Sequence, residues 1–208
     1  MKFRAMWVAV VAAWCATAQA APLNLKQVAA DAKWLVHLDV DAMRESSLVE
    51  RAYLAGSQQW SQVELWLSIA SYEVGVDPRV DLHGVTLFGT RLGKLEGIAL
   101  LHAEMQPSVM ISRAKAENGY QAGDYGKHQI HSWSDGTRTV AGAFFQPTLL
   151  VVARSEKEVQ EALDVLDGKA PSLAAEKPPV VEAGPRGSML AAWAQGLDAA
   201  SLKLRSPA

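Results

Sequence analysis

The sequence has a single cysteine, Cys15, and this residue lies inside an apolar run near the N-terminus. A chain without that run therefore has no disulfide, no thiolate metal site and no cysteine nucleophile. Its stability must then come from packing. No second apolar run reaches the length of a transmembrane helix, so we expect the processed protein to have no transmembrane anchor.

The signature motifs of common enzyme classes are also missing. The sequence has no Gly-x-Ser-x-Gly nucleophile elbow, no Gly-x-x-x-x-Gly-Lys phosphate loop, no Gly-x-Gly-x-x-Gly fingerprint and no His-Glu-x-x-His zinc motif. Catalytic groups can converge from distant segments, but no spacing in this sequence marks such a set. The sequence therefore favours a non-enzymatic protein and indicates no catalytic residue and no cofactor.

Residues 1–20 have the pattern of a secretory signal peptide. Lys2 and Arg4 form a basic start, an apolar run follows, and residues 18–20 read Ala-Gln-Ala, which fits the small-x-small cleavage pattern. We expect cleavage after Ala20. The sequence therefore predicts a periplasmic or secreted protein.

Removal of the signal changes the charge balance. It takes two of the 20 basic residues and none of the 22 acidic ones, which leaves a net charge of about −4. A net acidic protein repels phosphate backbones, so nucleic acid is not an expected partner. An envelope protein or a small ligand fits this balance better.

The chain has 208 residues, of which 50% are hydrophobic and 20% charged. This composition is typical of a globular protein with a packed core. We expect one α+β domain over residues 21–168, built on a mainly antiparallel sheet of about five or six strands with helices packed on one face. Apolar alternation or clustering predicts the strands, at residues 34–40, 84–89, 97–103, 128–133, 139–145 and 149–153.

Helices are expected between these strands. Asp41 is placed to cap the first, residues 58–74 carry an apolar stripe at helical spacing, and residues 107–117 form a third. Residues 155–158, Ser-Glu-Lys-Glu, form a capping box that begins the fourth helix, which continues to about residue 168.

The composition changes after residue 168. Residues 169–187 contain four prolines among alanines and charged residues, which predicts a linker without regular pairing. Residues 188–208 then predict a strand and the start of a helix. Two interpretations stay open for this segment: a C-terminal strand that completes the first sheet, or the beginning of a second repeat.

The turn and strand at residues 77–89 read Asp-Pro-Arg-Val-Asp-Leu-His-Gly-Val-Thr-Leu-Phe-Gly. Together with the hairpin segment 130–133 and the helix end at 162–168, this stretch resembles a family of secreted bacterial proteins of unknown function. The resemblance covers about residues 33–170. It implies export and a domain that often occurs in two similar halves, and it brings no catalytic residues with it.

Five residues are the candidates for contact with a ligand or partner. His37 and Asp39 share one face of the first strand, and with His131 they are expected on the uncovered face of the sheet. Asp81 and His83 lie in the turn at 77–89. Histidines and carboxylates together could also bind zinc, although the spacing matches no metal motif and we assign no metal ligand.

The expected function is an exported, non-enzymatic binding or interaction module of the cell envelope. One alternative is a metal-dependent hydrolase that uses histidine and aspartate ligands. Another is a carrier of an apolar ligand, because a sheet covered by a tryptophan-bearing helix can enclose an apolar molecule. The sequence names neither the ligand nor the oligomeric state.

Overall fold

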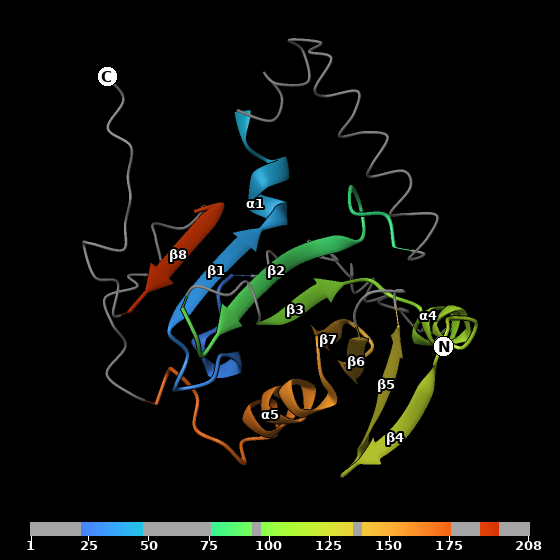
Figure 1. The fold of residues 1–208 in the computed structure, drawn as a ribbon. Coiled ribbons are helices and arrows are strands. Elements are labelled where there is room, and N and C mark those ends of the chain that lie inside the picture. The colour runs from blue at the N-terminus through green and yellow to red at the C-terminus, as the bar shows by residue number, and fades with distance from the viewer. Residues whose placement is uncertain (1–21, 48–75, 93–96, 135–138, 176–187, 196–208) are drawn as a thin grey trace, which may run out of the picture.

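The computed structural model describes residues 22–47, 76–92, 97–134, 139–175 and 188–195 (Figure 1). The expected signal peptide at 1–20, the expected helix at 58–74 and most of the expected linker lie outside these residues. The start of a helix expected after the C-terminal strand also lies outside them, whereas the expected strands and the helices that begin near residues 41, 107 and 155 begin within them.

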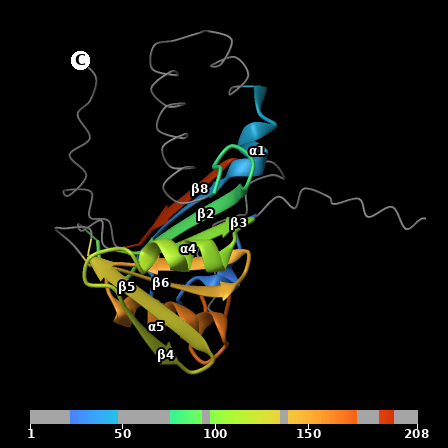
Figure 2. The same cartoon turned by 90° about the vertical axis from the view of Figure 1, so that its right-hand side faces the viewer.

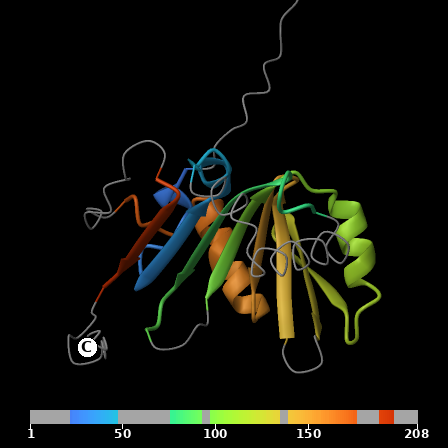
Figure 3. The ribbon, with the colours of Figure 1, turned by 90° about the horizontal axis from the view of Figure 1, so that it is seen from above.

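The described residues form one eight-stranded sheet in the order β4-β5-β6-β7-β3-β2-β1-β8, in which every neighbouring pair is antiparallel. Figure 3 shows this order from the red β8 on one side to the yellow strands on the other. The strands are β1 (Trp34–Asp39), β2 (Leu82–Gly89), β3 (Ile98–Ala103), β4 (Gln121–Tyr125), β5 (His128–Ser134), β6 (Thr139–Gln146), β7 (Leu149–Ala153) and β8 (Leu190–Ala194).

The mainly antiparallel α+β arrangement agrees with the sequence, but the expected count of five or six strands is too low. Strand β4, with the sequence Gln-Ala-Gly-Asp-Tyr, was not expected, because it is an exposed edge strand without apolar alternation. Strand β8 pairs with β1 along its whole length, so it extends the same sheet at the opposite edge.

The helices do not all pack on one face, contrary to the expectation. Helix α5 (Glu156–Leu166) contacts β3, β5, β6 and β7 on one face, whereas α4 (Pro107–Ala114) lies over β5 on the other, and strands separate the two helices in Figure 2. The 3-10 helix η1 (Leu25–Gln27) packs beside α5, and α1 (Val40–Arg44) follows β1 directly. None of the helices in the described part is long and apolar enough to cross a bilayer.

The hydrophobic core lies between the sheet and α5. Its largest fully buried side chains are Phe88, Leu35, Leu100 and Leu163, which come from β2, β1, β3 and α5. Ser155 starts α5 as predicted: its hydroxyl accepts a hydrogen bond from the Glu158 amide at 3.3 Å. The capping box therefore fixes the helix that closes this core.

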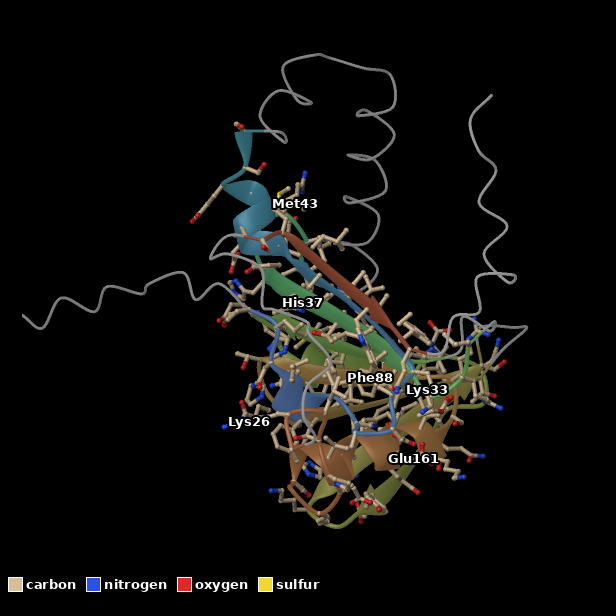
Figure 4. The ribbon with its side chains drawn as sticks, turned by 90° about the vertical axis from the view of Figure 1, so that its left-hand side faces the viewer. Lys26, Lys33, His37, Met43, Phe88 and Glu161 are labelled. Carbon is tan, nitrogen blue, oxygen red and sulfur yellow. The ribbon has the colours of Figure 1, made fainter. Side chains whose placement is uncertain are left out.

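The buried face of β1 is the opposite of the one expected. Leu35, His37 and Asp39 are buried, while Trp34 and the other residues of the alternate face are half-buried. Figure 4 shows His37 and Phe88 on the neighbouring strands β1 and β2. The stretch Trp-Leu-Val-His-Leu-Asp does not identify the core side, because apolar residues occupy both faces.

The start of the expected linker is packed and not extended. The backbone amide of Leu173 donates to the Val28 carbonyl at 2.8 Å, and the Leu173 side chain is buried in the core. The chain beyond α5 therefore returns to the N-terminal segment up to residue 175. One apolar residue among prolines and alanines gave too weak a signal to predict this contact.

Candidate functional site

An apolar pocket lies between α4 and the sheet, on the face opposite α5. Its volume is about 170 Å³. The helix side consists of Met110, Ile111 and Ala114, with Arg113 and Glu117 as its charged lining. The strand side consists of alternate residues of β5, β6 and β7, which share one sheet face, namely His131, Trp133, Gly142, Phe144, Leu150 and Val152.

Local sequence explains why α4 stands over this face. Pro107 occupies the first turn of the helix, where backbone amides have no partner within the helix, so the missing amide hydrogen of proline costs no hydrogen bond. After the helix, Gly119 has φ of +67°, a backbone conformation that glycine adopts without strain and that lets the chain turn into β4. The helix is therefore held at both ends beside β5.

The floor of the pocket depends on a residue without a side chain. His131 of β5, Gly142 of β6 and Val152 of β7 lie side by side across the sheet. A Cβ atom added at Gly142 would lie 3.2 Å from the Val151 carbonyl oxygen and would point toward the space that the pocket occupies. The missing side chain therefore leaves room between its two neighbours.

His131 is a polar residue of the pocket lining, and it makes a hydrogen bond with a neighbouring side chain. Its side chain is 5% exposed, and its Nδ1 lies 2.7 Å from the Tyr120 hydroxyl. The two rings stack with their centroids 6.0 Å apart. Burial lowers the pKa of His131 below its ordinary value, and the positive charge of Lys115 lowers it further. His131 is therefore neutral at physiological pH.

The other two residues expected beside His131 lie elsewhere. His37 is 2% exposed, and its Nδ1 lies 2.9 Å from the Thr86 hydroxyl on the core face of the sheet. Asp39 is 6% exposed and caps α1 by accepting from the Ala42 amide at 2.9 Å, a role that the sequence had assigned to Asp41. His37 and Asp39 are therefore not on an uncovered face, and they do not meet His131.

Asp81 and His83 hold the turn before β2. A carboxylate oxygen of Asp81 accepts from the Asp77 amide at 2.7 Å. Nδ1 of His83 lies 2.9 Å from the buried carboxylate of Asp41, which also pairs with Arg44. A carboxylate that orients an imidazole in this way fixes its tautomer, as in many general bases.

The same contacts tie α1 to the turn. Nη2 of Arg44 donates to the Pro78 and Leu82 carbonyl oxygens at 3.0 and 2.6 Å. Nε2 of His83 faces Glu104, whose nearer carboxylate oxygen is 4.0 Å away. The cluster is therefore explained as a clamp between the first helix and the β2 turn. Sequence spacing did not connect these residues, because Asp41 and His83 are far apart in the chain.

A second polar cluster was not expected from the sequence. The carboxylate of Asp167, at the end of α5, contacts His128 at 3.1 Å, Lys127 at 3.0 Å and Lys169 at 3.2 Å. Burial alone would raise the pKa of Asp167, but the hydrogen bonds from Lys127, His128 and Lys169 outweigh it and hold the pKa well below its ordinary range. The cluster fastens α5 to the β4–β5 hairpin.

Metal ligands do not assemble in the described part of the chain. No group of three histidine, aspartate or glutamate side chains within it lies close enough together to hold an ion. The histidines are distributed over both faces of the sheet and over its two ends. Each of the five histidines contacts a different side chain: Thr86 for His37, Asp41 for His83, Gln27 for His102, Asp167 for His128 and Tyr120 for His131.

Sequence reasoning found parts of the pocket without recognising it. Met110, Ile111 and Ala114 lie in the helix expected at residues 107–117, and Trp133 lies in the strand expected at residues 128–133. Tyr120 and Gly142 carried no signal, because their importance depends on strand pairing across the sheet. No protein-family profile, no curated protein and no solved structure matches the chain, so the functional inference depends on the geometry of the pocket itself.

Proposed function

We propose that the protein is an exported, non-enzymatic binding module of the cell envelope, and that it binds a small apolar molecule in the pocket under α4. The observation that supports this proposal is the apolar lining of the pocket. Met110 and Ile111 face Phe144 and Leu150 around a space of about 170 Å³. An apolar space of about 150 Å³ is known to accept a benzene-sized molecule.

The packing of α4 supports binding over a purely structural role. No residue of α4 is buried, although the helix directs apolar residues toward the sheet. Protein interiors are normally close-packed, so a helix that only covered the sheet would be expected to bury these residues. A ligand in the pocket would complete the packing of the α4 interface.

A titration of the chain from Ala21 onward with toluene, followed by ligand-observed NMR or calorimetry, tests the proposal. The expected result is saturable binding. Ala114→Leu enlarges a side chain of the lining and takes up space in the pocket. It is expected to weaken binding roughly tenfold or more, which corresponds to a loss of about 1.4 kcal/mol in binding free energy.

Ala116→Leu is the matched control. It makes the same change two residues further on, at an exposed position outside the pocket lining, and is expected to leave the affinity within about twofold of the wild-type value. Absence of saturable binding, or equal effects of the two substitutions, would contradict the proposal. Native mass spectrometry of protein purified from its own compartment would show a natural ligand as excess mass.

Export is the second part of the proposal, and it is supported by the signal-like pattern of residues 1–20 and by the resemblance to secreted proteins. Expression of the full-length chain in a Gram-negative host should give a periplasmic or medium fraction in which the protein begins at Ala21. Recovery of the uncleaved chain from the cytoplasm would contradict this part and would leave the pocket proposal unaffected.

A further inference from the structure

The direction of the hydrogen bond between Tyr120 and His131 depends on the tautomer of the imidazole. A phenol hydroxyl is a good donor, and a neutral imidazole has one acceptor nitrogen and one donor N–H. His131 is neutral because burial and Lys115 lower its pKa. If the Tyr120 hydroxyl, 2.7 Å away, donates to Nδ1, the proton of the neutral imidazole lies on Nε2.

The second nitrogen of this imidazole is the one available to a ligand. Nδ1 contacts the Tyr120 hydroxyl, and no hydrogen bond to Nε2 is found among the described residues. The His131 side chain is 5% exposed and lines the pocket beside the apolar residues Met110 and Phe144. A ligand that fills the pocket displaces water from this nitrogen, so an occupant that accepts a hydrogen bond from Nε2–H is favoured over one that cannot.

We infer that the ligand is an apolar molecule with one hydrogen-bond acceptor oxygen, such as an aromatic or short aliphatic ketone or ester, and that His131 Nε2–H donates to this oxygen. This inference depends on the proposed function, since it assigns the chemistry of the same pocket. Apolar sites commonly use a single polar group to fix ligand orientation. His131 is then a specificity-determining residue, and Tyr120 positions it.

The test compares two ligands of the same shape. Acetophenone has a carbonyl oxygen where α-methylstyrene has a methylene group. In the wild-type chain, acetophenone is expected to bind roughly five- to tenfold more tightly, the usual effect of one net hydrogen bond. His131→Leu is expected to abolish the difference, and Ala116→Leu, outside the pocket, is expected to preserve it.

Each outcome separates the two proposals. Equal affinity of the wild-type chain for both ligands would overturn the assignment of His131 and leave apolar binding intact. Binding of neither ligand would overturn the proposed function and this inference together. A long-range ¹H–¹⁵N NMR spectrum of the wild-type chain reports the tautomer directly and does not depend on a variant that folds: a proton on Nδ1 would also overturn the assignment.

Discussion

The Tyr120 hydroxyl lies 2.7 Å from Nδ1 of His131, and this bond joins the segment after α4 to strand β5. Tyr120 lies just before the edge strand β4, so the bond connects the segment between α4 and β4 to β5, the second strand of the sheet. It determines which nitrogen of His131 faces other groups, and it fixes the ring at the wall of the pocket.

The first prediction concerns this bond. Tyr120→Phe removes the hydroxyl and leaves the Nδ1 of the buried His131 without its hydrogen-bond partner, so the free energy of unfolding is expected to decrease by about 1–3 kcal/mol. Tyr125→Phe is the matched control, since its hydroxyl donates to Asp164 at 2.8 Å and Asp164 keeps its pairing with Lys169. Urea denaturation measures the free energy of unfolding of both variants. An equal or larger loss in the control would contradict a special role for Tyr120.

The second prediction concerns pH. Burial, followed by the charges of His37 and His83, lowers the pKa of His102, and burial followed by Lys115 lowers that of His131. These two histidines therefore begin to bind protons at about pH 6.5 in the unfolded chain and at a lower pH in the native chain. The free energy of unfolding then decreases as the pH falls below this value.

Urea denaturation at about pH 7 and about pH 5 measures this loss. The double substitution His102→Gln and His131→Gln is expected to reduce the difference between the two pH values, because glutamine does not titrate. A pH dependence that is unchanged in the double variant would assign the acid sensitivity to other groups.

The third prediction concerns the cluster around Asp167. Asp167→Asn removes the negative charge that pairs with Lys127, His128 and Lys169. It is expected to lower the free energy of unfolding by roughly 1–3 kcal/mol near neutral pH. Since the pKa of Asp167 is lowered in the native state, its stabilisation is present above the ordinary value of 3.8 and is lost as the pH falls below it.

The difference between wild type and Asp167→Asn should therefore shrink in acid. Asp124→Asn is the control, because its exposed carboxylate has a long contact of 3.5 Å with Gln129 and no other polar contact among the described residues. A difference that stays constant down to about pH 2 would show that the Asp167 charge is not the stabilising feature.

The fourth prediction concerns the pocket floor. Gly142→Ala places a methyl group 3.2 Å from the Val151 carbonyl oxygen and beside the pocket, so it is expected to weaken toluene binding by roughly tenfold. It should also destabilise the fold by about 1 kcal/mol through crowding.

Gly123→Ala is the matched control on the exposed edge strand β4, where an added Cβ meets nothing within 4 Å. Calorimetric titration and thermal unfolding measure the two effects. Unchanged binding in Gly142→Ala would place the ligand away from this floor.

Strand existence was largely predictable from the sequence, while strand edges and helix placement were not. Apolar clustering marked β1, β2, β3, β5, β6 and β7, and the capping box marked α5. The exposed strand β4 has no such signal. The helix pattern of α4 does not indicate the side of the sheet on which it packs, which depends on its contacts with β5.

The sequence by itself determined the mainly antiparallel α+β class and the position of α5, because these follow from local periodicity and capping. The tertiary structure decided which residues meet. His37, Asp39 and His131 are residue types that could form a site together. Strand pairing and the alternation of side chains place His131 on a different face of the sheet from His37 and Asp39. Asp41 reaches His83 and Tyr120 reaches His131 only because folding brings separate elements together, and no local pattern records such distances.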